Sequence, residues 1–195
     1  MDIENDAYVK KLVDKIGENF QKLENYLQRK YPGEKYLKTK VEIRFPRGYF
    51  RKCEDFRKRY PCNDQTIGRN VSYAIFSTDL IRWLLNRFKL LGTLRSMVIK
   101  LGVVIVTSAI EGIIHDTLRV LGIKPAKSLK KNIEKLRQEG VISERLAKEL
   151  QKFRKKRDNI HLYVVREWEY QKYTLADYNR GIILLKYLNE ELQGK

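Results

Sequence analysis

One stretch of the chain, residues 97–114, restricts the possible folds more than any other. Between Val103 and Ile114 apolar residues occur on nearly every side of the helix that the stretch predicts, so this helix should be the most buried element of the fold. Lys100 and Glu111 interrupt the run, so only about ten residues between them are uncharged. A membrane helix needs about 20 apolar residues in a row. The stretch therefore predicts the central helix of a soluble helical bundle.

Five further helices are predicted by apolar residues that recur at a spacing of three and four. Four of them cover residues 7–31, 71–91, 128–138 and 143–164, and the central helix itself covers 93–121. The fifth runs from a cap at Thr174 or Asp177 to residue 192. The expected buried side of the last helix is Ile182, Ile183, Leu184, Leu188 and Leu192. No repeat or flexible linker divides the chain, so the sequence predicts one all-α domain over residues 1–195 with its helical core at 71–192.

Residues 34–70 lack a sustained helical period and predict a basic, partly irregular insertion in this helical bundle. The alternation of charged and apolar residues over 38–45 also allows a short strand. Ten basic residues stand against four acidic ones between Lys38 and Asn70. The cations considered for nucleic-acid binding are Arg44, Arg47, Arg51, Lys52, Arg57, Lys58 and Arg59. The interleaved aromatics, Phe45, Tyr49, Phe50, Phe56 and Tyr60, would either stack on unpaired bases or pack onto the helical body.

The chain is strongly basic, with 41 Lys and Arg against 24 Asp and Glu and a formal net charge of +17. A domain with this excess attracts polyanions, of which nucleic acid is the first to consider. A membrane surface or a solvated Lys-rich exterior are the alternatives. No apolar run follows Met1, so no signal peptide is predicted, and we expect a cytoplasmic protein without a membrane partner.

Metal and cofactor chemistry find no motif in this sequence. There is no Gly-rich phosphate loop, CxxC or HExxH, and neither histidine lies near Cys53 and Cys62. The two cysteines are too few for a secreted disulfide framework, so free thiols are expected, although a local pair is conceivable. We therefore predict neither a metal site nor a cofactor.

The residues best suited to chemistry lie on the predicted helix 143–164. Arg154 and His161 are seven residues apart and point within roughly 20° of each other, while Arg157 points within roughly 40° of His161. Histidine transfers protons near neutral pH, and arginine can neutralise charge that develops on a phosphate. The 2′-hydroxyl of RNA is its own nucleophile, so such a pair could cleave RNA without a metal. A solvated basic helix with one ordinary histidine is the simpler alternative.

This helix resembles the signature of the HEPN superfamily (higher eukaryotes and prokaryotes nucleotide-binding), in which an Arg precedes a His by a few residues on a long helix. The match is Arg154, six intervening residues and His161, with RDNIH from Arg157 as a second possible register. The resemblance implies a homodimer whose motif helices form one composite cleft and a metal-independent ribonuclease activity. It also implies roles in the site. His161 would be the acid or base and Arg154 the phosphate-stabilising residue, supported by Arg157, Asp158, Asn159 and Glu111. Apart from the resemblance, the charge of Lys155 and Lys156 makes them candidates for nucleic-acid binding.

The ending His161-Leu162-Tyr163 is similar to that of the HepT-like toxins within this superfamily. That resemblance implies modification of Tyr163 by a nucleotidyltransferase-like antitoxin. On a straight helix, however, Tyr163 points roughly 160° from His161. Two other functions stay open at this point. One is a nucleic-acid-binding module without catalysis, and the other is a protein-interaction subunit of a defence complex.

Overall fold

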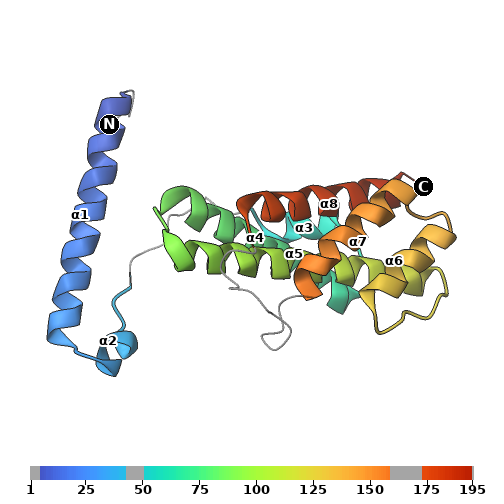
Figure 1. Ribbon diagram of the computed structural model, residues 1–195, viewed down its shortest axis with the longest axis horizontal. Helices are drawn as coiled ribbons and strands as arrows, with labels where there is room; N and C mark the ends of the chain where they lie inside the picture. The colour runs from blue at the N-terminus through green and yellow to red at the C-terminus, as the bar shows by residue number, and fades with distance from the viewer. Residues whose placement is uncertain (1–4, 43–50, 159–172, 195) are drawn as a thin grey trace. The chain divides into compact units, whose positions relative to one another are not determined.

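The computed structural model describes residues 5–42, 51–158 and 173–194, and within these ranges it contains eight helices and no strand. The prediction of an all-α helical bundle is confirmed (Figure 1). The sequence allows a short strand over residues 38–45. Lys38 is the last residue of α2, and residues 39–42 are not a strand. The rest of that segment lies outside the described residues.

The contacts divide the chain into two compact units, residues 1–46 and 47–195. The first unit contains α1 (Asp6–Lys30) and the short α2 (Glu34–Lys38), which packs against α1. The prediction of one domain over the whole chain stays a prediction. The boundary falls inside the segment that was predicted as an insertion.

The second unit is built around two long helices that form an antiparallel pair. The pair consists of α4 (Gln65–Arg87) and α5 (Gly92–Val120), and α3 (Cys53–Arg59) packs against α4. The apolar stretch of the sequence lies in α5, and its residues Val103, Val106 and Ile114 have no exposed surface. The predicted central helix is therefore the centre of the bundle.

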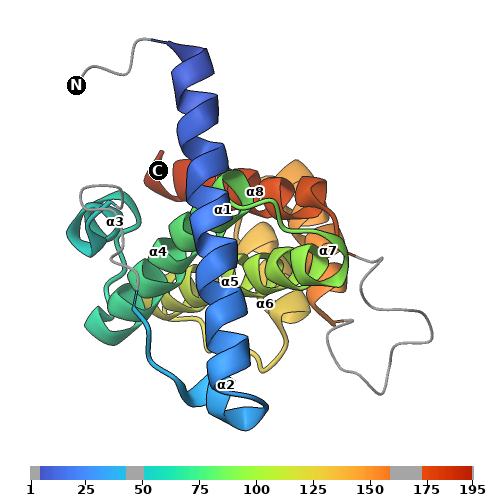
Figure 2. The ribbon, with the colours of Figure 1, turned by 90° about the vertical axis from the view of Figure 1, so that its left-hand side faces the viewer.

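Three shorter helices complete the second unit. They are α6 (Leu129–Gln138), α7 (Glu144–Asp158) and α8 (Leu175–Gln193). All three pack against α5, and α7 also packs against α6 and α8. Figure 2 shows this bundle from the end that lies at the left in Figure 1. The arrangement buries the apolar face of α7 and leaves its basic face outside.

Several predicted helix ends are confirmed because they depend on local chemistry. Thr174 and Asp177 form a capping box at the start of α8. Gly122 and Gly140 follow α5 and α6 with φ of 72° and 65°, a backbone conformation that favours glycine. Ser128 precedes α6 as predicted.

Two predictions about helices are wrong in detail. The helix expected from residue 71 begins at Gln65, because the side chain of Asp64 accepts hydrogen bonds from the backbone of Thr66 and Ile67 and caps the helix there. In α8, Ile183 is 41% exposed and Leu185 is buried in its place. The position of α8 against both α5 and α7 selects the buried side, and the apolar residues of the helix alone do not identify it.

Among the described helices, α5 is the one that is long and apolar enough to cross a membrane by length and composition. Half of its most apolar window, 50%, is buried inside the structure, where α5 packs against α4, α6, α7 and α8. The core helix of a soluble protein has the same length and composition, so this finding is only a weak indication of a membrane span.

Candidate nucleic-acid site

The basic end of α7 is held in place by the apolar face of the same helix. The apolar spacing over residues 143–164 predicts a core stripe made of Leu146, Leu150, Phe153, Ile160 and Val164. Leu146, Leu150 and Phe153 are each at most 5% exposed, which confirms the first half of this stripe. The remaining stripe residues, Ile160 and Val164, lie outside the described residues. The buried stripe fixes the rotation of α7, and thereby the side on which its cations stand.

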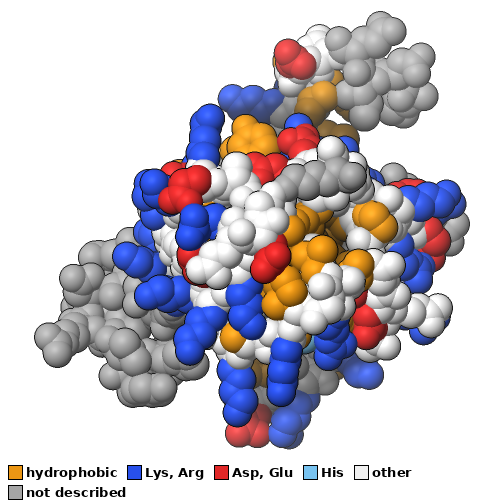
Figure 3. All heavy atoms as spheres, turned by 90° about the vertical axis from the view of Figure 1, so that its right-hand side faces the viewer, with side chains coloured by type: hydrophobic (Ala, Val, Ile, Leu, Met, Phe, Trp, Pro, Cys, Tyr) orange, Lys and Arg blue, Asp and Glu red, His pale blue; other side chains and the backbone are white. Residues whose placement is uncertain are grey.

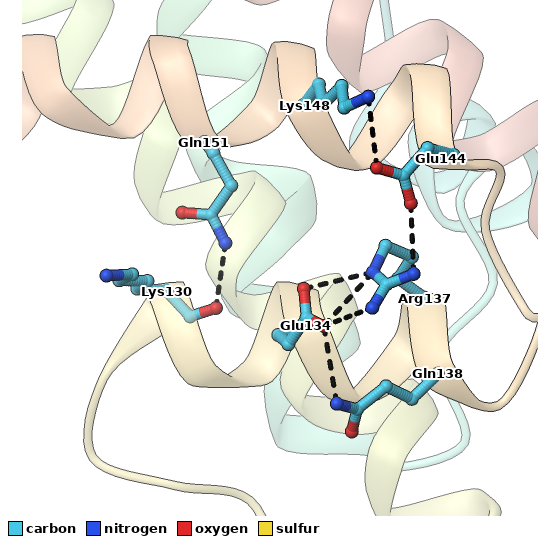
Figure 4. A network of polar contacts seen from close by, with 7 residues as sticks. All are labelled: Lys130, Glu134, Arg137, Gln138, Glu144, Lys148 and Gln151. Carbon is cyan, nitrogen blue, oxygen red and sulfur yellow. Dashed lines mark hydrogen bonds and ion pairs between the residues drawn. The ribbon is translucent and has the colours of Figure 1, made fainter.

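Polar contacts between α6 and α7 add to this placement (Figure 4). The Arg137 guanidinium lies 3.0 Å from Glu144 and also pairs with Glu134 on its own helix. The hydrogen bonds that Arg137 donates to Glu134 hold the pKa of the Glu134 carboxyl below its usual range. Further along α7, the amide of Gln151 donates to the backbone carbonyl of Lys130 at 2.8 Å.

Arg154 continues this row of contacts from Gln151. Its Nε donates to Oε1 of Gln151 at 3.3 Å, and its side chain is half-buried. The contact runs along α7 towards the C-terminal end of the helix, where the candidate site was predicted. Arg154 is thus attached to a side chain that is itself bound to α6, which restricts the guanidinium more than a solvated surface position would.

The two lysines after Arg154 differ in their surroundings. Lys155 is exposed, whereas the ammonium group of Lys156 lies 3.2 Å from the carboxylate of Asp177 at the start of α8. Partial burial raises the pKa of Asp177, but hydrogen bonds from Thr174 and Lys156 outweigh it, so this pKa lies below its usual range. Of the two, Lys155 is the one placed as a nucleic-acid contact would require.

Several predicted site residues cannot be placed. His161, Asn159 and Tyr163 lie outside the described residues. Arg157 and Asp158 belong to α7, but their side chains are not described. The distance between Arg154 and His161, and the choice between Arg154 and Arg157 as the motif arginine, therefore stay predictions from the sequence.

Glu111 stands half-buried on α5 beside a shallow, open depression of about 510 Å³. The depression is lined by Asp64, Thr66, Ile67, Ser108, Glu111, Gly112, His115 and Arg119. All of these residues come from α5 or from the start of α4, so the structure groups Glu111 with the second histidine of the chain. The predicted supporting role of Glu111 beside Arg154 stays a prediction.

Asp116 is a buried acidic residue of α5, only 4% exposed, and sequence reasoning did not single it out. Its carboxylate accepts backbone hydrogen bonds from Asn63 at 2.8 Å and from Asp64 at 2.9 Å. It thereby anchors the loop that starts α4. Its place on an otherwise apolar helix was a signal, but its partners are more than 50 residues away in the sequence and could not be identified.

The predicted basic surface at 34–70 is only partly a free cationic surface. Arg51 forms a bidentate pair with Asp79 on α4, at 2.6 and 2.9 Å, and its guanidinium lies over the ring of Phe56. The hydrogen bonds to Asp79 raise the pKa of Arg51. Arg57 pairs with Glu54 on its own helix. Arg51 therefore connects the segment before α3 to α4 in addition to carrying charge.

The remaining candidate cations of this segment fall into two groups. Lys52, Lys58 and Arg59 are exposed and remain candidates for contacts to phosphate, while Arg44 and Arg47 lie outside the described residues. For two of the aromatics the packing alternative is confirmed, because Phe56 is 1% exposed and Tyr60 packs against the core. Phe45, Tyr49 and Phe50 lie outside the described residues.

Both cysteines are free thiols, and Cys62 is partly buried beside the anchored loop. Burial, and then the carboxylates of Asp116 and Asp64, raise the pKa of Cys62 to about 11. Because the thiolate is the reactive form, we expect Cys62 to react with iodoacetamide at pH 8 about 10²-fold more slowly than a free cysteine.

Mass spectrometry of the Cys62 peptide during a time course measures this rate, and the same reaction in urea is the control, in which the rate should rise to that of a free cysteine. Fast alkylation of Cys62 in the folded protein would contradict the expectation.

Within residues 5–42, 51–158 and 173–194, no three His, Cys, Asp or Glu side chains group closely enough to hold a metal ion. No family model matches the chain, and neither a curated protein nor a solved structure is significantly similar to it. The resemblance of the motif helix to the HEPN superfamily therefore rests on Arg154, His161 and their neighbours alone.

Proposed function

We propose that the chain is a metal-independent endoribonuclease of the HEPN type, and that two copies form its site. The observation that carries the proposal is the spacing of Arg154 and His161 on one predicted helix face. The all-α bundle and the half-buried, tethered position of Arg154 on α7 support it. The excess of 17 positive charges supports RNA as the substrate.

The proposed chemistry assigns one task to each residue. His161 takes the proton of the 2′-hydroxyl, or donates a proton to the leaving 5′-oxygen. The 2′-oxygen attacks the adjacent phosphorus, the bond from phosphorus to the 5′-oxygen breaks, and the products are a 2′,3′-cyclic phosphate and a 5′-hydroxyl. The Arg154 guanidinium neutralises the charge that builds on the phosphate oxygens during this step.

A second copy is part of the proposal because the reaction needs both a base and an acid. Each chain carries one histidine on the motif segment, since His115 belongs to α5. Two motif segments that face each other supply two histidines and two arginines to one phosphate.

We further propose that the activity serves a toxin–antitoxin or phage-defence system, with Tyr163 as the residue that a nucleotidyltransferase-like antitoxin modifies.

The positive surface provides the binding that such a cut requires. On the face drawn in Figure 3, many Lys and Arg side chains lie around an exposed apolar area, with some Asp and Glu among them. Cations attract the phosphates of RNA without reading its sequence, and the attraction weakens steeply with salt because bound counterions are released. Lys155, next to Arg154 and exposed, is placed to contribute to this attraction.

The test is a cleavage assay with the purified full-length chain in the presence of EDTA. We expect cleavage of single-stranded RNA into fragments that end in a 2′,3′-cyclic phosphate, as read by mass spectrometry. A substrate with 2′-deoxy nucleotides at the cut sites is the matched control and should be bound but not cleaved.

The same assay separates the enzyme from the alternative, a nucleic-acid-binding module without catalysis. That alternative is favoured by the net charge alone. It predicts binding of RNA and DNA that weakens steeply between about 50 and 200 mM salt, with no products at any salt concentration. Binding without products from the purified protein would overturn the enzyme and leave the module.

A further inference from the structure

The helix α1 has an apolar face that the helices of its own unit leave largely uncovered. Its buried apolar residue is Leu27, whereas Val13 is 59% and Ile16 58% exposed. The other exposed apolar residues of the helix are Tyr8, Val9, Leu12, Phe20 and Tyr26. A helix of 25 residues with such a face is stabilised mainly by packing against another element.

The spacing along this face is the alternation of three and four that two paired helices require. It runs through Val9, Val13, Ile16, Phe20, Leu23 and Leu27. In heptad terms these residues alternate between the d and a positions, and the next a and d positions at the two ends are Asp6 and Lys30. The outward positions of the same heptads carry polar residues, with the exception of Ala7 and Tyr8.

We infer that α1 pairs in antiparallel orientation with α1 of a second copy of this chain. In this arrangement Ile16 packs against the partner's Phe20 and Val13 against the partner's Leu23, which is half-buried in the single chain. Val9 lies over the partner's Leu27, which is 7% exposed in the single chain and so adds little to the contact. The two-fold axis repeats each contact, which gives six apolar layers. The inference goes beyond the proposed function and does not depend on it, although a two-fold symmetric pair is compatible with a site shared by two copies.

Charge complementarity selects a second copy and the antiparallel direction. Lys10 and Glu24 occupy equivalent flanking positions, so antiparallel pairing places Lys10 opposite the partner's Glu24 twice. It also places Asp6 opposite the partner's Lys30 at both ends of the layers. A parallel pair in register would instead put Asp6 on Asp6 and Lys30 on Lys30, which repel.

The two flanks of the face fit the same arrangement. On one flank the hydroxyl of Tyr36 in α2 donates to the carboxylate of Glu24. Tyr26 points roughly 160° away from Glu24, on the other flank, where it is 47% exposed. The antiparallel pair places Tyr26 against the partner's Leu12, which is 37% exposed in the single chain. The second copy thus covers the flank of Tyr26, and on the other flank its Lys10 shares the carboxylate of Glu24 with Tyr36.

Gly17 lies at the middle of this proposed contact. A glycine inside a helix costs about 1 kcal/mol relative to alanine. A Cβ at Gly17 would meet nothing within 4 Å, so the packing of α1 and α2 gives no reason for a glycine there. In the antiparallel pair Gly17 faces the partner's Gly17 across the two-fold axis, where the absence of side chains lets the two helices approach closely.

Crosslinking tests the contact directly, in full-length protein with Cys53 and Cys62 replaced by serine. Asn19 lies next to the two-fold axis and opposite the partner's Asn19, whereas Glu18 points away from the pair. With a short bis-maleimide, Asn19→Cys should give a covalent dimer, and the matched variant Glu18→Cys should give at least tenfold less. Adding Ile16→Glu to Asn19→Cys should lower the yield at least tenfold. Equal yields from both cysteines, or no dimer from Asn19→Cys, would overturn the pairing.

Charge exchange tests the direction of the pair by sedimentation. Lys10→Glu and Glu24→Lys should each weaken self-association about tenfold, because each places like charges opposite one another twice. A mixture of the two variants should associate as the original chain does, since every carboxylate at these flanking positions then faces an ammonium group of the partner. Lys15→Glu makes the same charge change on the outward face and should have no effect.

Three results of the sedimentation test overturn the inference. The first is an original chain that stays monomeric, with a mass of 23.3 kDa, at about 100 µM. The second is a mixture of the two variants whose association is not restored, and the third is a Lys15→Glu variant that associates as weakly as Lys10→Glu. A monomer that loses stability on Ile16→Glu would place the face of α1 against its own residues 47–195 instead. RNA cleavage by the same variants is measured separately, so failure of the pair and failure of the enzyme are distinguishable.

Discussion

Replacement of His161 by alanine is expected to lower the rate of RNA cleavage by about 10²–10⁴-fold, the contribution that a general acid or base makes. His115→Ala is the matched control, because it removes the other of the two histidines from the depression beside α4 and should change the rate less than about threefold. Single-turnover cleavage of a labelled RNA in EDTA measures both variants. RNA binding should be retained by both.

The reverse outcome would assign the active site to other residues. If His115→Ala abolished cleavage and His161→Ala did not, the depression with Glu111, His115 and Arg119 would be the site in place of the motif helix. Loss of activity in both variants together with a lowered melting temperature would indicate unfolding, so circular dichroism accompanies each measurement.

A second pair of variants separates the chemistry of Arg154 from general charge. Arg154→Ala should lower cleavage by about 10²-fold or more, as removal of a group that stabilises transition-state charge does. Lys155→Ala removes the same charge from the adjacent exposed position and should weaken binding only slightly. Similar losses from both would show that the two residues contribute only to the electrostatic attraction.

The largest effect on stability is expected from Tyr178→Ala, about 3–5 kcal/mol in the free energy of unfolding. The Tyr178 ring is 1% exposed, and its hydroxyl donates to the backbone carbonyl of Thr78 on α4 at 2.8 Å. The ring also packs on Gly102 of α5, where a Cβ would lie 2.7 Å from it. One side chain of α8 thus joins the two long helices.

Two further variants show where the effect of Tyr178 comes from. Tyr187→Ala makes the same substitution on the same helix at a side chain that is 48% exposed, and should change stability by less than about 0.5 kcal/mol. Tyr178→Phe keeps the ring and removes the hydrogen bond, at a cost of about 1–2 kcal/mol. Urea unfolding followed by circular dichroism measures all three, and equal effects of the two alanine variants would contradict the packing described.

The structure bears on what the resemblance implies at two points, the all-α fold and the helix α7. The all-α fold, the burial of Leu146, Leu150 and Phe153, and the helical position of Arg154 were predictable from apolar spacing, and the structure confirms them. The relation between Arg154 and His161 was predictable only as an angle around a straight helix. Such an angle says nothing about contacts between two copies of the chain.

The sequence by itself determined the features that depend on neighbouring residues. The helical run at 103–114, the capping box of Thr174 and Asp177, and the turns at Gly122 and Gly140 follow from apolar spacing and hydrogen bonds within a few residues.

Only the tertiary structure decided which of several similar side chains are buried and paired. Asp116 and not Glu111 is the buried acid of α5, Arg51 is paired with Asp79, and Phe56 is in the core. Each depends on residues that lie far away in the sequence and come close only when the helices pack. The apolar face of α1 is the opposite case, because its apolar spacing is strong and yet α2 covers little of it. Local pattern predicts that a face will be buried, and the geometry of the packed elements decides what buries it.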